Sequence, residues 1–317
     1  EQNGSPWFNY GERGQHYDFG TLTGWGGSVW YKWTVTCRGT TGLTNQASGI
    51  VRITTPPSVA LSSPANLAKF NAPASVSLQA TASDADGITK VEYFRGTPGN
   101  YVSLGSSTTF PYLVTWSSAP AGIYFITAVA TDGKGATTRS ASRKIYVNGS
   151  PPSLNNKGFE FPSVGSGSAA WVLGPAADGW TFDSLSGVSG NNSAFTSGNS
   201  VAPAGQQVGI LHGVGSVRQS VTFQPGYYKI QVKVAKRGNF SLCAPVGPNP
   251  CPPAINVTVC GSAAGQIVPG ATSYQTKTSD AFEKATAGSC EIKLQGISQN
   301  GADIASFIDD VKVIVAP

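Results

Sequence analysis

The residue that most needs a chemical explanation is a carboxylate near the C-terminus. The segment 306–315, S-F-I-D-D-V-K-V-I-V, has apolar residues at a period of two, which predicts a β-strand with one buried face. The apolar positions are Phe307, Val311, Val313 and Val315. Asp309 falls on the same face, where a carboxylate needs a cation, several N–H donors or a basic group. Glu160, in the aromatic segment N-N-K-G-F-E-F-P, is a candidate partner.

The histidines and the adjacent acidic pair offer no catalytic arrangement. His16 and His212 belong to no nucleophile elbow, no H-E-x-x-H motif, no phosphate-binding glycine loop and no recognisable triad. We interpret His212 as an ordinary packed or turn histidine. Asp309 and Asp310 are neighbours on one predicted strand, so they point to opposite faces and do not form a facing acid–base pair. The sequence therefore predicts that the protein is not an enzyme.

The cysteines suggest disulfides. None of the five forms the C-x-x-C pair of a zinc site or redox motif. Because the chain has a secreted character, we expect Cys243–Cys251 to close the loop C-A-P-V-G-P-N-P-C and Cys260–Cys290 to join two strands. Cys37 is then a free buried thiol, the partner of a cysteine on a missing segment, or half of an intermolecular bond.

Composition predicts an all-β protein. Charged residues make up 12% of the chain, against roughly 25% in an average soluble domain, and no long helical periodicity is present. The net charge of +5 is scattered, which argues against nucleic acid as a partner. No apolar run approaches the ~20 residues of a membrane span, and no signal peptide is visible. Since the chain lacks Met and begins at Glu1, we expect a processed or excised product.

The elements that must position Asp309 and Glu160 carry a family resemblance. It rests on G-F-E (158–160), G-W-T-F (179–182), Q-S-V-T-F-Q-P-G-Y-Y-K-I-Q-V (219–232) and F-I-D-D-V-K-V (307–313). Residues 155–317 resemble the galactose-binding-like jelly rolls of bacterial carbohydrate-binding modules and secreted surface proteins. The resemblance implies a structural calcium site between the first and last strands, with Glu160 and Asp309 as ligands and Asp310 as an alternate. The alternative is a carboxylate held by backbone donors or a lysine.

The middle of the chain carries a second resemblance. Its strand-like segments include A-S-V-S-L-Q-A-T-A-S-D-A-D-G, I-T-K-V-E-Y-F and A-G-I-Y-F-I-T-A-V-A-T-D-G. Residues 58–148 resemble a bacterial immunoglobulin-like repeat over their whole length, which implies a seven-strand sandwich with Trp116 in its core. Asp84, Asp86 and Asp132 lie in its turns, where they either cap the turns or bind calcium near a domain junction.

The first 55 residues look like part of a third sandwich. S-P-W-F-N-Y-G-E and V-W-Y-K-W-T-V-T-C resemble the later strands of a fibronectin type III domain, without its two opening strands. Half a sandwich leaves an apolar face and an unpaired edge in water. Either upstream residues of a longer precursor cover it, or a neighbouring molecule adds strands. The residues proposed for self-association are Trp7, Phe8, Tyr31, Trp33 and Cys37.

Proline-containing linkers at 54–58 and 148–153 join these modules into tandem β-sandwiches, for which we consider two secreted, cell-surface functions. In one, the chain is an accessory carbohydrate-binding module of a polysaccharide-degrading enzyme. Its aromatic residues would stack on sugars unless they are core residues, and its amides would donate hydrogen bonds. These residues are Trp171, Trp180, Tyr227, Tyr228, Asn191, Asn192 and Gln206. In the other, which we favour, copies of the chain complete one another by β-strand addition and form a fibre or surface layer.

Overall fold

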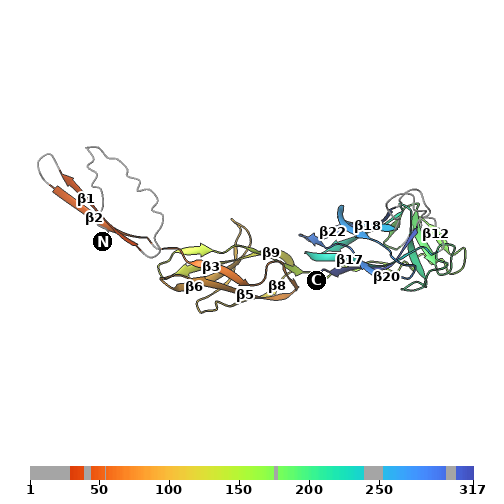
Figure 1. Cartoon of the computed structure of the whole chain (residues 1–317), viewed down its shortest axis with the longest axis horizontal. Coiled ribbons are helices and arrows are strands. Elements are labelled where there is room, and N and C mark those ends of the chain that lie inside the picture. The colour runs from red at the N-terminus through yellow and green to blue at the C-terminus, as the bar shows by residue number, and fades with distance from the viewer. Residues whose placement is uncertain (1–28, 39–43, 54, 175–177, 239–252, 298–304) are drawn as a thin grey trace. The chain divides into compact units, whose positions relative to one another are not determined.

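The computed structural model describes residues 29–38, 44–53, 55–174, 178–238, 253–297 and 305–317, and before residue 55 it describes the backbone only. Within these ranges the regular secondary structure is β-strand throughout, as the composition predicts (Figure 1). The chain divides into two compact units, Glu1–Pro56 and Pro57–Pro317. Each unit is considered by itself.

The first unit contains one antiparallel hairpin. Strand β1 (Val29–Arg38) pairs with β2 (Thr44–Ile53) over their whole length, from Val29 opposite Ile53 to Arg38 opposite Thr44. Among the residues that the structure describes, no third strand joins this sheet. The strand predicted around Val29–Cys37 is therefore present. The side chains proposed for self-association lie outside the described part of the molecule.

The second unit begins with a sandwich of two sheets. One sheet has the order β4-β11-β9-β6-β7, with β10 beside β9, and the other has the order β3-β5-β8. The strands are β3 (Ser58–Ser63), β4 (Ala68–Asn71), β5 (Ala74–Ser83), β6 (Ile88–Arg95), β7 (Val102–Ser107), β8 (Val114–Ala119), β9 (Gly122–Asp132), β10 (Thr137–Arg139) and β11 (Arg143–Asn148). We call this the first sandwich.

Alternating residues of these strands form the core of the first sandwich. Along β5, Val76 and Leu78 are fully buried while Ser75 and Ser77 are exposed, which is the period of two that one buried face requires. The largest fully buried side chain is Tyr93, whose hydroxyl donates to the backbone oxygen of Tyr112 at 2.6 Å. Trp116, expected in the core, is only half-buried and packs against its margin.

A second sandwich follows, again with two sheets. The larger has the order β12-β14-β15-β23-β17-β20, with β21 beside β17, and the smaller has the order β13-β16-β22-β18-β19. The strands are β12 (Trp171–Leu173), β13 (Thr181–Phe182), β14 (Ser186–Gly190), β15 (Gln207–His212), β16 (Ser216–Phe223), β17 (Gly226–Lys236), β18 (Ala254–Val259), β19 (Ser262–Ile267), β20 (Gln275–Thr278), β21 (Phe282–Lys284), β22 (Gly288–Ile297) and β23 (Ala305–Val315). Strand β23 lies in the interior of the larger sheet, between β15 and β17.

The second sandwich has a large core between its sheets and a disulfide at one edge of it. The aromatic side chains buried in this core are Phe159, Trp180, Phe182, Phe223 and Tyr228. The predicted disulfide Cys260–Cys290 is present and joins the end of β18 to β22. Residues 243 and 251, the other predicted pair, lie outside the described ranges, and so does the side chain at position 37.

A β-bulge in β23 corrects the predicted face of this strand. The register between β17 and β23 shifts between Gln231 and Lys233, and Asp310 adopts φ 46°. The extra residue reverses the alternation, so Val311 and Val313 face the main core whereas Phe307 packs in a separate cluster on the outer face of the sheet. The predicted period of two placed Phe307, Val311 and Val313 on one face, because a regular alternation does not account for an inserted residue.

The two sandwiches of the second unit meet where β11 of the first contacts β17 and β21 of the second. The rings of Tyr146 and Tyr227 stack with centroids 4.9 Å apart, and the Lys144 Nζ lies 2.5 Å from the Glu283 Oε2. The linker backbone is bonded as well, because the Gly149 N–H donates to the Pro225 oxygen at 3.0 Å. These bonds hold the linker predicted at 148–153 against the second sandwich.

Candidate functional site

The two predicted acidic ligands come together at one segment of the second sandwich. Asp309 is fully buried, and its Oδ2 accepts a hydrogen bond from the Ala204 N–H at 2.8 Å. The carboxylate of Glu160 accepts from the Gln206 N–H at 3.1 Å and from the Gln207 N–H at 3.2 Å. Both carboxylates therefore fasten residues 204–207, at the start of β15.

Burial dominates the electrostatics of this pair. It raises the pKa of Asp309 to about 7, although the N–H groups of Ala204 and Asp310 oppose that rise, and the charges of Asp310 and Glu160 add to it. The pKa of the nearby Tyr274 phenol is also raised, first by burial and then by the charge of Asp309. A carboxyl group in this environment stays protonated up to nearly neutral pH unless a cation is bound beside it.

The pair has the ligand chemistry of calcium, but its oxygens already have protein donors. Carboxylate oxygens suit Ca²⁺, which takes six to eight such ligands. Oδ1 of Asp309 accepts from the Asp310 N–H at 2.6 Å, and the other carboxylate oxygens accept the bonds given above. Asp310 does not join the pair, because its Oδ2 lies 2.6 Å from the Lys312 Nζ and 3.8 Å from the Lys233 Nζ. Calcium at Glu160 and Asp309 stays a prediction.

The structure corrects most of the predicted sugar-binding aromatics. Trp180 is 2% exposed and Tyr228 is fully buried, so both are core residues with no face available to a ligand. Tyr227 is half-buried, with one face against Tyr146 of the first sandwich. Trp171, on the edge strand β12, is 40% exposed and remains the one predicted aromatic with an open surface.

Trp171 belongs to an aromatic cluster that the sequence analysis did not anticipate. Its ring packs edge-on against Phe195, with centroids 5.0 Å apart. The ring centroids of Phe195 and His212 are 6.3 Å apart. The guanidinium of Arg237 lies 4.8 Å from the ring centroid of Phe195. Phe195 is an aromatic residue within the polar sequence N-N-S-A-F-T-S-G-N, and that contrast was the available signal. We call Trp171, Phe195, His212 and Arg237 the edge cluster.

A buried hydroxyl network holds Phe195 in place. Ser193 Oγ accepts from the Phe195 N–H at 3.1 Å and lies 2.5 Å from Ser189 Oγ of β14. Thr196 Oγ1 donates to the Gly190 oxygen at 2.7 Å. Ser and Thr side chains satisfy the backbone of a loop in this way. The loop 191–206 is therefore anchored directly beneath its aromatic residue.

The predicted amide residues lie on the same loop. The Asn191 N–H donates to the Gln206 oxygen at 3.0 Å, so the two ends of the loop meet. The side chain of Asn191 is used internally, since its Oδ1 accepts from the Ala202 N–H at 2.8 Å. The side chains of Asn192 and Gln206 are exposed. Asn192 and Gln206, unlike Asn191, therefore have exposed amides on the loop that carries Phe195 of the edge cluster.

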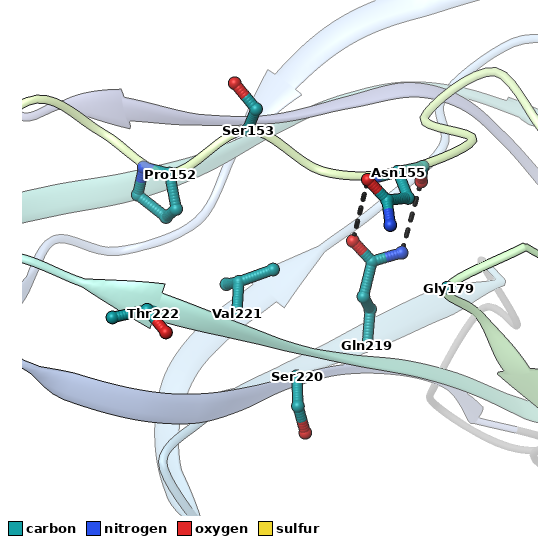
Figure 2. Close-up of a pocket in the computed structure, with 8 residues that line it drawn as sticks. All are labelled: Pro152, Ser153, Asn155, Gly179, Gln219, Ser220, Val221 and Thr222. Atoms are coloured by element: carbon teal, nitrogen blue, oxygen red, sulfur yellow. Dashed lines mark hydrogen bonds between the residues drawn. The ribbon is translucent and has the colours of Figure 1, made fainter.

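A polar cleft on the opposite sheet lacks an aromatic surface. Its volume is about 280 Å³, and it is lined by Pro152, Ser153, Asn155, Gly179 and residues 219–222. Figure 2 shows the amide of Gln219 facing the backbone of Asn155, where it accepts from the N–H at 2.9 Å and donates to the oxygen at 3.1 Å. Both polar atoms of the Gln219 amide are thus committed to holding the backbone of Asn155, just after the linker.

Comparisons with known proteins agree with the predicted architecture. Residues 57–128 match a family model described as a bacterial Ig domain, which confirms the predicted immunoglobulin-like repeat over that range. No curated protein matches the chain. In the part that the structure describes, no helix has the length and apolar character needed to cross a membrane.

Several solved structures share its β-sandwich folds. Fibronectin(III)-like modules of CbhA from Clostridium thermocellum are 28% identical over 28% of this chain and 94% of that chain, with a TM-score of 0.27. TmCBM61, solved with β-1,4-galactotriose, is 17% identical over 53% of this chain and 100% of that chain, with a TM-score of 0.32. A carbohydrate-binding module CBM36, solved with calcium and xylotriose, is 19% identical over 36% of this chain and 85% of that chain, with a TM-score of 0.26.

Proposed function

We propose that the chain is a non-catalytic, extracellular binding protein whose second sandwich holds polysaccharide at the edge cluster. The observation that carries this proposal is the exposed ring of Trp171, 40% accessible and supported from the side by Phe195. An exposed, rigid aromatic face can stack on the apolar face of a sugar ring, and neighbouring amides fix its orientation. Asn192 and Gln206 supply such amides. The Cys260–Cys290 disulfide supports an oxidising, extracellular location.

The Glu160–Asp309 pair supports the site indirectly in this proposal. Both carboxylates fasten residues 204–207, and Gln206 is one of the two exposed amides. Their role is therefore structural, whether backbone donors alone satisfy them or calcium joins them. The first sandwich positions the second as a spacer does, through the bonded linker.

The test is binding of soluble polysaccharides by Trp171→Ala, measured by affinity electrophoresis and calorimetry. Truncating a central aromatic contact typically costs about 2 kcal/mol or more, so we expect at least a tenfold loss of affinity. Phe110→Ala is the matched control, because Phe110 is 73% exposed in the first sandwich and should not affect binding. Equal affinities of the two variants for every polysaccharide that the wild type binds would contradict the proposal.

A second function, self-association through the first unit, is favoured by the hairpin of β1 and β2. Two ten-residue strands form a sheet that no third described strand joins, and a two-stranded sheet alone is marginally stable in water. Strands from another copy would complete the sheet and link molecules into a fibre. Trp7, Phe8, Tyr31, Trp33 and Cys37 remain the residues proposed for that contact.

Sedimentation of the full chain and of residues 56–317 separates these two functions. We expect the full chain to associate as its concentration rises, whereas the fragment stays monomeric. Trp33→Ser should weaken association without changing polysaccharide binding. A full chain that stays monomeric at high concentration, with β1 and β2 protected from hydrogen exchange, would leave polysaccharide binding as the function.

A further inference from the structure

Three carboxylates converge at the end of the first sandwich where β3 begins. Asp84 and Asp86 lie in the turn between β5 and β6, and Asp132 is the last residue of β9. One ligand oxygen from each lies within 4.8 Å of the other two. Calcium binds oxygen at 2.3–2.6 Å, so two oxygens on one ion lie at most about 5 Å apart. The spacing is compatible with three ligands that share one ion.

Asp132 has a buried oxygen that turn capping does not explain. The residue is 1% exposed, and its Oδ1 accepts from the Lys134 N–H at 2.8 Å and the Ala136 N–H at 2.9 Å. Those two bonds are the ordinary capping role of an aspartate in a turn. Oδ2 is also buried, yet it has no hydrogen-bond partner. A buried carboxylate oxygen without a partner is costly, and a cation would satisfy it.

The two turns that carry the carboxylates are locked together. The Gly133 N–H donates to the Gly87 backbone oxygen at 3.1 Å, and a Cβ placed on Gly133 would lie 2.4 Å from the backbone oxygen of Asp86. Within the first turn, Asp84 Oδ1 accepts from the Asp86 N–H at 2.8 Å. The carboxylates of Asp84 and Asp132 are therefore held by backbone N–H groups before any ion binds.

The charges of Asp84 and Asp132 are not paired with a basic side chain in the part of the chain that the structure describes. Lys90, the nearest lysine along β6, is paired with Glu92 at 3.0 Å. Carboxylates this close repel one another, and a divalent cation reverses that repulsion into attraction.

We propose that Asp84, Asp86 and Asp132 bind one calcium ion, with Oδ2 of Asp132 as the buried ligand. Backbone oxygens and water complete the coordination, as calcium's flexible geometry permits. Magnesium suits the site less well, because it requires a near-ideal octahedron with shorter bonds of about 2.0–2.1 Å. The ion would bind the β5–β6 turn to the end of β9, and so would stiffen the end of the first sandwich next to Ser58.

The test uses the full chain freed of metal by chelation. Calorimetry with calcium chloride should show a site that Asp132→Asn weakens at least tenfold. Asparagine keeps the Oδ1 acceptor of the turn, so this variant should fold, and without calcium it should be at least as stable as the wild type. Asp309→Asn is the matched control for the second sandwich and should leave this site intact. Asp178→Asn, at an exposed residue of the second sandwich, controls for net charge.

Hydrogen exchange assigns the site to its residues. In the wild type, calcium should slow amide exchange in 84–90 and 131–137 several-fold, and in Asp132→Asn it should not. If calcium leaves exchange in these segments unchanged in the wild type, or if Asp132→Asn binds calcium as tightly as the wild type, the carboxylates only cap turns and the proposal is wrong. Should Asp132→Asn fail to fold, Asp84→Asn and wild-type exchange decide the question.

Discussion

The buried carboxyl of Asp309 makes the stability of the second sandwich depend on pH in an unusual direction. Its pKa is raised to about 7 in the folded protein, chiefly by burial, from an ordinary value of 3.8. A group that binds its proton more tightly when folded stabilises the fold at acid pH and loses that contribution as pH rises. The contribution is full below pH 3.8 and disappears as the pH passes about 7. One pKa unit is about 1.36 kcal/mol, so three units correspond to about 4 kcal/mol.

The expected result is that metal-free wild-type protein becomes easier to unfold between pH 4 and pH 8, by up to about 4 kcal/mol in the second sandwich. Asp309→Asn carries no ionisable group, and its unfolding free energy should change much less over this interval. The measurement is urea unfolding at several pH values, followed through exchange of amides in β17 and β23. Glu160, Asp310, Lys233 and Tyr274 surround the carboxyl and are unchanged in both proteins.

A matched control tests the cause. Burial alone would raise the pKa of Asp310, but Lys312 and Lys233 outweigh it and hold that pKa below its usual range. Asp310→Asn should therefore remove stability that is present at neutral pH and lost in acid, the opposite trend. If wild type and Asp309→Asn show the same pH dependence, burial does not control this carboxyl. Saturating calcium should abolish the wild-type loss of stability at pH 8 only if the ion binds at Glu160 and Asp309.

Two further predictions concern the second sandwich. Replacing Cys290 by Ala opens a disulfide with a sequence separation of 30 residues, and loop-closure entropy predicts a loss of about 3–4 kcal/mol, measured by denaturant unfolding with and without reductant. Gly205→Ala should cost at least about 2 kcal/mol, because φ is +86° and the added Cβ would lie 2.2 Å from the Glu160 Cδ. Gly261→Ala is the control, because Gly261 has a similar φ of +78° but no atom lies within 4 Å of an added Cβ. This variant should therefore lose only the free energy of unfolding that the left-handed backbone conformation costs an alanine. Equal losses in the two glycine variants would show that contact with Glu160 does not matter.

The sequence was sufficient for the features that depend on local pattern. Alternating hydrophobicity located the strands, the lack of helical periodicity predicted the all-β class, and cysteine placement predicted the Cys260–Cys290 bond. Asp309 was recognised as a buried carboxylate because a charge among apolar residues is visible in any strand. Its pairing with Glu160 came from a resemblance, since residues far apart in sequence have no local signal of contact.

The features that depend on inserted or tertiary structure were not predictable. The bulge at Asp310 changes which residues share a face with Val311, and one extra residue in a strand leaves no mark on a period-two pattern. Trp171 and Trp180 both lie at edge strands, yet Trp171 is 40% exposed whereas Trp180 packs in the core between the two sheets, and no local pattern distinguishes the two positions. Phe195 reaches Trp171 only through a loop whose path depends on buried hydroxyl groups.

The fastening of that loop bears on how the edge cluster binds. Loop 191–206 is held at its start by Ser193 and Thr196 and at its end by Asp309, whose Oδ2 accepts from the Ala204 N–H. When a loop becomes ordered on binding, the lost conformational entropy weakens the affinity. A loop that is already fixed in the free protein avoids most of this loss. One exposed ring and two amides still provide few contacts, which limits the affinity of a single site. A polymer that presents the same sugar repeatedly, or a fibre that presents many copies of the sandwich, raises the effective concentration without any new contact. Polysaccharide binding and self-association are therefore compatible, because a fibre of many copies would bind a repeating polymer more tightly than a single copy does.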